Sequence, residues 1–397
     1  MPNAARSVDS RPAAAPPTPG RRPGAGGVVE VNAHLRELTA AGVGALSVVL
    51  DLPTRAGQDS DDPAAAGRVG AAGVAIDSLD DMRVLFAGIP LGRVEVALAA
   101  DAPAAVLLLL HQLVAEEQGF EGAELVGTVH NDPLREHLLP GPRLLPARAG
   151  LRLAGDLFDH ARAELPRWRT LALCGRPQAR AGASPAQEIA FTLANALEYT
   201  RTALAGGYPL VAFAPRVSLC LSAPAHARTA ARLWPRLLRD AFGAEAAGVP
   251  APRFRVHPLR DPRPGPGPGP RADARPAAVE AAAGTLLARI EAAGGAVAAI
   301  EAGLPAAELG PAPATPGTPT LPTAPGAGAA RPPIEVRQAE RLAKLRAWRD
   351  GDRVALALAG LGAAAGAGRN VLPPMRTALA AGATLAETCA VLRTTWP

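Results

Sequence analysis

The sequence has almost no lysine, few aromatic residues and no basic segment. Lys344 is the only lysine among 41 basic residues, and aromatic residues make up 3% of the chain. Proteins that bind nucleic acids place clustered basic side chains against phosphates, often with aromatic side chains between them. The arginines here are scattered among alanine, glycine and proline, so the formal charge of +5 does not indicate a nucleic-acid partner.

Cysteines and long apolar runs are also scarce. Cys174, Cys220 and Cys389 lie far apart in the sequence and match no metal-binding or redox spacing. The N-terminus contains arginines but no apolar segment of the kind found in signal peptides. The longest run of large apolar residues, Val106 to Leu110, is too short to span a bilayer. These features predict a cytoplasmic protein without a membrane partner.

Glycine and proline are abundant instead, with 41 and 42 residues, and they mark linkers between compact segments. We predict a disordered leader over residues 1–27 and a compact domain over 28–258. A Pro/Gly linker over 259–276 leads to a helical segment over 277–309. A second linker over 310–333, rich in proline, glycine and threonine, leads to a helical C-terminal region over 334–397. The apolar fraction of 48% is sufficient for a buried core.

Short apolar runs alternate with helical patterns through the compact domain, which predicts an α/β fold of parallel βαβ units. The expected strands are residues 45–50, 74–76, 94–98, 125–129, 171–174, 217–221 and 254–256. Eight such units close a (β/α)8 TIM barrel. No eighth unit is visible, because the segment 260–270 is rich in proline, which removes the donors that a central strand needs. We therefore predict an incomplete barrel, followed by a helical C-terminal region. A partner or a substitute segment should cover its open strand edges.

Several segments carry a family resemblance. They are Leu46 to Thr54, the acidic turn Asp59 to Asp61, Gly73 to Met82 and Phe86 to Leu91. In this order and spacing they resemble the barrel domain of methylmalonyl-CoA mutases. The resemblance extends from about Gly42 to His257, and residues 279–304 and 334–393 resemble the helical region that follows the family's barrel.

The resemblance implies a barrel that binds an acyl-CoA ester along its axis. The family carries cobalamin on a separate domain through a histidine in an Asp-x-His-x-x-Gly motif, which this sequence does not contain. We therefore expect that this chain binds no cofactor alone and receives adenosylcobalamin through a cobalamin-binding mutase subunit. The family's activity is that of an isomerase, an intramolecular transferase.

The family's catalytic positions are substituted. A Ser-Gly-Tyr-His segment ends the fifth strand in the family, whereas this sequence has Cys174-Gly175-Arg176-Pro177. Pro140 stands where the family has the arginine that binds the substrate carboxylate, although Arg143 lies three residues further on. The resemblance thus implies that no catalytic residue is retained.

Five positions match the family's substrate-binding residues. They are Thr128, His130, Arg216, Ser218 and His257, of which His130 replaces a glutamine. The alternative is structural: relatives keep barrel motifs for packing, and single histidines near strand ends are mostly structural. Asp59, Asp61 and Asp62 resemble a metal site, but acidic residues of this kind more commonly cap a helix or face water, so we predict no metal.

Three functions are compatible with these features. The leading hypothesis is a pseudoenzyme-like subunit that forms a heterodimer with a cobalamin-bearing mutase chain. The second is an active acyl-CoA isomerase that uses a separate cobalamin-binding protein. The third is a decayed gene copy, in which the Pro/Gly segment marks lost coding sequence.

Overall fold

The computed structural model describes residues 26–139, 141, 143–256, 275–310 and 333–397, and it contains two parallel sheets. The first sheet has the order β1-β2-β3-β4 and the second β5-β6-β7. The strands are β1 (Ala45–Val49), β2 (Glu95–Ala99), β3 (Val126–Val129), β4 (Trp168–Arg169), β5 (Leu171–Cys174), β6 (Val217–Leu221) and β7 (Arg253–Val256). Thr170 separates β4 from β5, so the two sheets adjoin along the chain without forming one ladder.

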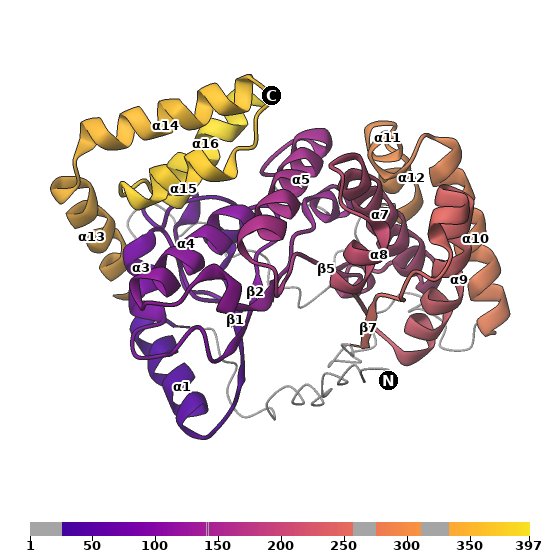
Figure 1. The fold of residues 1–397 in the computed structure, drawn as a ribbon, viewed down its shortest axis with the longest axis horizontal. Helices are drawn as coiled ribbons and strands as arrows, with labels where there is room; N and C mark the ends of the chain where they lie inside the picture. Colours follow the sequence, from indigo (N-terminus) through magenta and orange to yellow (C-terminus); the bar gives the residue numbers. More distant parts are fainter. Residues whose placement is uncertain (1–25, 140, 142, 257–274, 311–332) are drawn as a thin grey trace, which may run out of the picture.

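Long helices connect the strands and cover the outer side of the sheets (Figure 1). They are α4 (Ala104–Glu117), α5 (Ala147–Glu164), α7 (Pro185–Ala205) and α9 (Pro224–Phe242). Within each sheet, each strand therefore returns parallel to the previous one after a helical crossover, as the sequence pattern predicts. The α/β prediction is confirmed as a partial TIM-barrel-like arrangement. Among the described residues β7 pairs with β6 alone.

Shorter elements complete this part of the chain. They are α1 (Val28–Ala40), α2 (Leu52–Arg55), α3 (Leu79–Leu85), α6 (Arg176–Arg180), α8 (Leu210–Phe213) and the 3-10 turns η1 (Pro63–Ala65), η2 (Gly122–Glu124), η3 (Pro133–Leu138), η4 (Ala214–Arg216) and η5 (Gly243–Ala246). Helices α1 and α3 pack against each other beside the first sheet.

The strand expected at residues 74–76 forms only single bridges, from Val74 to Gly26 and to Leu50. Gly73 lies so close to the first strand that an added Cβ would be 2.1 Å from the backbone carbon of Leu50. The chain then turns at once into α3 after Ser78. The segment is therefore buried beside β1 but too short to continue a ladder.

The helical segment expected over 277–309 is not one continuous helix. It begins with α10 (Pro276–Ala292) and α11 (Ala296–Glu301). Gly294 and Gly295 separate them with φ angles of +99° and +96°. This is a conformation that residues with a Cβ rarely adopt, so the two glycines end one helix and redirect the chain into the next. Helix α12 (Leu304–Leu309) follows, and α10 packs on α7 and α9.

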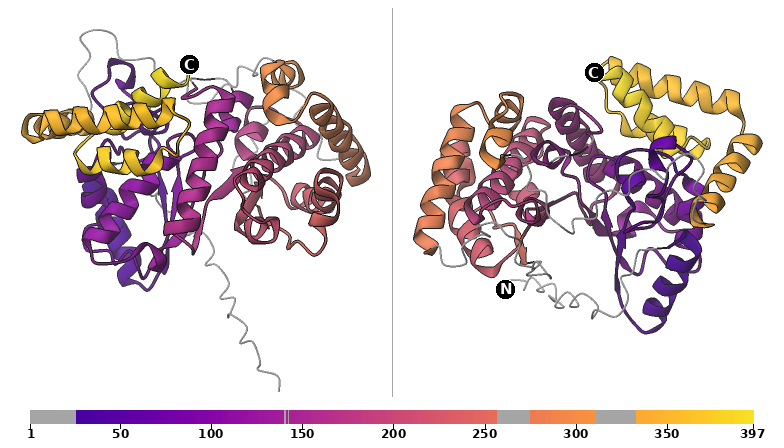
Figure 2. Two further views of the ribbon diagram at one scale, coloured as in Figure 1. Left: turned by 45° about the horizontal axis from the view of Figure 1, so that its top comes forward. Right: turned by 180° about the vertical axis from the view of Figure 1, so that it is seen from behind.

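The C-terminal region is helical and packs on the first sheet's helical layer (Figure 2). It comprises α13 (Pro333–Trp348), α14 (Gly351–Gly366), α15 (Leu372–Ala380) and α16 (Leu385–Thr395). Helix α15 lies on α4, which explains why α4 is buried all round: residues 104–115 are all buried, between the sheet on one side and α15 on the other. Within the described residues, none of the helices has the length and apolar character needed to cross a bilayer.

Candidate functional site

Small and polar side chains line the side of the sheets that faces away from the covering helices. In β1 and β2 the burial alternates, and the large apolar residues point to the helices. In β5 and β6 the leucines at 171, 173, 219 and 221 are at most 1% exposed, whereas the residues between them keep 6–8% exposure. We call the opposite side the inner face. Its central residues are Ser47, Ala97, Thr128, Arg169, Ala172 and Ser218.

The inner face differs from the interior of an ordinary TIM barrel. Such barrels are filled by layers of large branched side chains. Here the central positions carry alanine, serine and threonine beside one arginine, and the inner-face residue Val49 is 38% exposed. This face therefore carries smaller and more polar side chains than the interior of such a barrel.

Thr128 and Ser218 both lie on the inner face, one in each sheet. Thr128 is in register with Ala97 of β2 and Arg169 of β4, and Ser218 with Ala172 of β5. The Thr128 hydroxyl is buried and has no hydrogen-bond partner among the described residues. A buried hydroxyl without a partner is unfavourable, so this oxygen is suited to bind a ligand group.

Arg216 and His130 lie at opposite ends of their strands. Arg216 precedes β6 and donates from Nη1 to the carbonyl oxygen of Trp168 at 3.1 Å. His130 follows β3, where its backbone N–H donates to Leu98 at 2.9 Å and its carbonyl accepts from Asp101 at 2.6 Å. Ser218 lies between these levels. The structure therefore places Thr128 and Ser218 on the inner face, Arg216 before β6 and His130 after β3, while His257 and Pro140 lie outside the described residues.

A buried ionic network occupies the carboxyl ends of β2 and β3. The Asp101 carboxylate accepts from Arg135, and from Arg55 at 3.2 Å. Burial raises the pKa of Asp132 to about 6, although Tyr199 donates to its carboxylate at 3.0 Å. Burial also raises the pKa of Glu136 to about 7. At this end of the strands, burial therefore favours the protonated forms of Asp132 and Glu136 relative to exposed carboxylates.

A second polar cluster at the carboxyl end of β6 was not predicted from the sequence. Glu188 is fully buried and accepts from the Ser222 backbone N–H at 2.7 Å and from the Ser222 hydroxyl at 2.6 Å. The same carboxylate lies 2.7 Å from Nδ1 of His226. No motif marks this cluster, because its members come from α7, the end of β6 and α9.

The substituted family positions begin helix α6. Gly175 precedes this helix, and Arg176 and Pro177 form its first turn. Proline has no ionisable group, so the position where the resemblance expects a histidine has no proton to transfer. Glu188 and Thr192 fill the space beside Gly175, since an added Cβ there would be 2.7 Å from either side chain.

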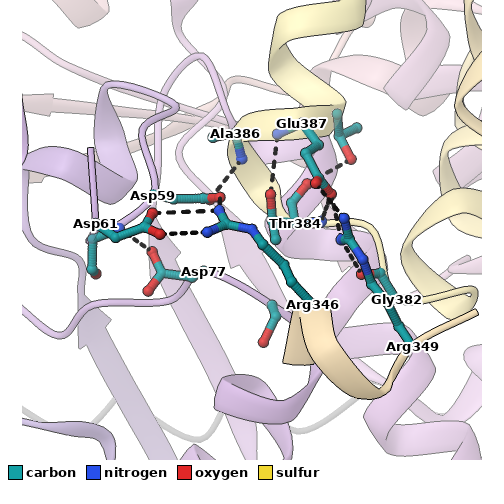
Figure 3. Close-up of polar contacts among 12 residues, drawn as sticks. Asp59, Asp61, Asp77, Arg346, Arg349, Gly382, Thr384, Ala386 and Glu387 are labelled. Carbon is teal, nitrogen blue, oxygen red and sulfur yellow. Dashed lines mark hydrogen bonds and ion pairs between the residues drawn. The ribbon is translucent and has the colours of Figure 1, made fainter. Parts of the chain in front are cut away.

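The acidic turn contacts the C-terminal helices (Figure 3). Arg346 of α13 donates to Asp59 at 2.9 Å and also pairs with Asp61. Asp59 accepts in addition from the backbone N–H of Ala386 at 3.0 Å. Asp62 caps the short turn η1 through the N–H of Ala64. These carboxylates therefore hold the C-terminal region against the end of β1.

Two further aspartates take part in this attachment. Arg341 donates to Asp81 at 2.9 Å, and the backbone N–H of Leu385 donates to the carbonyl oxygen of Asp77 at 2.8 Å. Burial raises the pKa of Asp77 well above its usual range, and the nearby carboxylates of Asp81 and Asp59 raise it further. Within the described residues, no group of three or more potential metal ligands is present.

Comparisons with known proteins agree with this arrangement. The family model for methylmalonyl-CoA mutase matches residues 20–257 and 329–397. The methylmalonyl-CoA mutase large subunit of Propionibacterium freudenreichii subsp. shermanii is 39% identical over 221 residues, which cover 54% of this chain and 30% of that protein. The methylmalonyl-CoA mutase of Escherichia coli (strain K12) is 40% identical over 189 residues, 48% of this chain and 26% of the relative.

A probable mitochondrial methylmalonyl-CoA mutase of Caenorhabditis elegans is 36% identical over 226 residues, 55% of this chain and 30% of the relative. The chain thus spans less than a third of the length of these relatives. The family model covers well over half of the chain, in the sheets and in the C-terminal helices alike. This chain belongs to the methylmalonyl-CoA mutase family.

Proposed function

We propose that this chain is a mutase-type subunit that binds an acyl-CoA ester on its inner face, lacks catalytic competence alone and pairs with a cobalamin-bearing mutase chain. The observation that carries the proposal is the start of α6. Arg176 and Pro177 occupy this turn at the carboxyl end of β5, where the family resemblance expects a tyrosine and a histidine. A rearrangement that depends on an acid at this position has no donor there.

Ligand binding is supported by the inner face. The buried Thr128 hydroxyl is without a partner among the described residues, and Ser218 lies on the inner face of the second sheet, in register with Ala172. Arg169 is in register with Thr128, and Arg253 with Ser218. Guanidinium groups bind phosphate and carboxylate oxygens through paired hydrogen bonds. Arg169 already pairs with the Glu95 carboxylate, so the groups of this face that remain for an elongated, anionic thioester are the hydroxyls of Thr128 and Ser218 and the guanidinium of Arg253.

Pairing with another chain is supported by two exposed features. Strand β7 is paired on one side only among the described residues, and an unpaired strand edge favours association. Trp348 at the end of α13 is 88% exposed and Leu356 of α14 is 76% exposed. Exposed tryptophan is enriched at the energetic centres of protein interfaces.

We assign adenosylcobalamin to the partner, because the sequence lacks the family's Asp-x-His-x-x-Gly motif and three of the described histidines have other surroundings. His111 is fully enclosed and His160 contacts Gln112 in the core. His226 shares the Glu188 carboxylate with Ser222. The cofactor would supply the radical chemistry. The residues of this chain would bind and orient the thioester and limit its contact with water.

Calorimetric titration with methylmalonyl-CoA, together with a turnover assay, tests the proposal. We expect binding without conversion to succinyl-CoA when adenosylcobalamin is added to the purified chain. Affinity purification from the native host should recover a larger, cobalamin-bearing mutase chain. Conversion by the purified chain with coenzyme alone would contradict the proposal, as would recovery of the chain only as a monomer at micromolar concentration.

The retained binding positions also favour one alternative, an active isomerase that uses a separate small cobalamin-binding protein. Thr128 and Ser218 lie on the inner face, at positions where the family resemblance implies contacts with the substrate. Turnover that appears only when such a protein is added would support this alternative. If the chain binds the thioester but shows no turnover with any such protein encoded by the host, the alternative is excluded and the subunit proposal is supported.

A further inference from the structure

Cys174 and Cys220 are direct neighbours in the second sheet, although 45 residues separate them in the chain. They are in-register partners of the parallel strands β5 and β6. Residues in register on parallel strands point to the same face, so both thiols lie on the inner face. We propose that Cys174 and Cys220 form a redox-active dithiol, which hydrogen peroxide converts into a reversible intramolecular disulfide.

The spacing of the strands suits this bond. Neighbouring strands lie about 4.8 Å apart, which is within the range of about 4.4–6.8 Å between the Cα atoms of disulfide-bonded cysteines. Side chains in register are nearly parallel, whereas a disulfide needs Cβ atoms about 3.8 Å apart. Closing the bond therefore requires the two side chains to approach by about 1 Å. The strain makes the disulfide easier to reduce than an ideal one, and this favours reversibility.

The surroundings distinguish this pair from the third cysteine. Cys174 and Cys220 are 8% and 6% exposed, whereas Cys389 is 1% exposed. Burial raises the pKa of the Cys389 thiol to about 12, which keeps it protonated. The buried guanidinium of Arg135 lies near enough to Cys174 for their charges to interact. The same guanidinium pairs with Asp101, and the thiolate is the reactive form of cysteine.

The chemistry uses one peroxide molecule. The Cys174 thiolate attacks one peroxide oxygen, the O–O bond breaks, and protonation of the leaving hydroxide gives water and a sulfenic acid. The Cys220 sulfur then attacks the sulfenic sulfur, which releases the second water and forms the S–S bond. Both sulfurs are oxidised by one electron each, and the peroxide is reduced to two waters. A dithiol reductant such as dithiothreitol reverses the change.

Thiol counting and peptide mapping of the full chain test the proposal. After reduction, desalting and treatment with peroxide, the number of thiols alkylated under denaturing conditions should fall from three to one. Trypsin cleaves poorly before proline, so Cys174 is expected in the peptide 170–180 and Cys220 in the peptide 217–228. These two peptides should be recovered as one disulfide-linked species that disappears after treatment with dithiothreitol.

Single variants provide the controls. Cys389→Ser should still form the linked species, whereas Cys174→Ser and Cys220→Ser should not. In Cys220→Ser the sulfenic acid at Cys174 should be trapped by dimedone. The wild-type map decides the question even if a variant misfolds. Retention of three thiols at peroxide doses that oxidise a control dithiol protein, or a link that includes Cys389, would overturn the proposal.

Discussion

The hydrogen bonds around the buried Glu188 carboxylate allow a prediction about the stability of the protein. Glu188 is completely buried, and its carboxylate accepts both donors of Ser222 and contacts Nδ1 of His226. Replacement by alanine removes the only acceptor that these contacts share and leaves a cavity beside Gly175. Unsatisfied buried groups cost about 1–3 kcal/mol each, and a cavity adds to this. We expect Glu188→Ala to lower the free energy of unfolding by about 3–5 kcal/mol.

The variant Glu188→Gln separates the hydrogen bonds from the packing. The amide keeps the volume and one acceptor oxygen, but its NH2 group must face the Ser222 hydroxyl or the His226 ring. These partners can turn to accept, at the cost of a different hydroxyl orientation and imidazole tautomer. We therefore expect a smaller loss than for alanine, about 1–2 kcal/mol.

Urea unfolding followed by far-ultraviolet circular dichroism measures both effects. With a slope of about 3 kcal/mol per molar urea, the alanine variant should shift the midpoint by about 1 M or more. Glu164→Ala is the matched control, because Glu164 is exposed and surface changes are usually within about 0.5 kcal/mol. The slope should be equal in all variants. A loss for Glu188→Ala no larger than that of the control would refute the reasoning.

Four other predictions follow from the site. Thr128→Val should weaken acyl-CoA binding about fivefold to tenfold in calorimetry without lowering stability, because it removes a hydroxyl that lacks a partner among the described residues. Thr170→Val, at the junction of the sheets, is the control. Equal affinities of the two variants would contradict the role of Thr128. Glu136 has a raised pKa, so its stabilising protonated form is lost as the pH rises through about 7. The urea midpoints of wild type and Glu136→Gln should therefore diverge between pH 5.5 and 8, because the free energy of unfolding of the wild type falls by on the order of 2 kcal/mol relative to that of the variant. A difference in midpoint that stays constant over this pH range would argue against a raised pKa of Glu136. Arg346→Met should lower stability by about 1–3 kcal/mol, because it leaves the buried Asp59 without its ion pair, whereas Arg353→Met on exposed α14 should have little effect in the same urea assay. Trp348→Ala should weaken recovery of the partner chain at least tenfold without changing the urea midpoint, since Trp348 is 88% exposed; undiminished recovery would place the interface elsewhere.

The sequence predicts the fold class because strand and helix patterns are local. The runs at 45–50 and 217–221 become β1 and β6, and the patterns at 104–118 and 185–205 become α4 and α7. Val74 shows the limit of this approach. Its apolar run has strand composition, yet close packing of Gly73 on Leu50 and the immediate start of α3 allow only single bridges. A run of three residues does not reveal how many backbone groups will find a partner.

The predicted binding residues were found through family motifs, and the structure adds how they are arranged. Thr128 and Ser218 share the inner face, whereas Arg216 lies before its strand and contacts Trp168. Their roles in binding stay predictions. The role of Asp59 could not be predicted from its acidic turn, because its partner Arg346 lies 287 residues further along the chain.

The sequence by itself determined the alternation of helices and strands, the family membership and the substitutions at Arg176 and Pro177, since each is written in neighbouring residues. Only the tertiary structure decided that Glu188 meets His226 across 38 residues and that Cys174 lies beside Cys220. The physical reason is that local patterns select the backbone conformation. Strand register and helix packing bring distant side chains together, and these depend on the whole core at once.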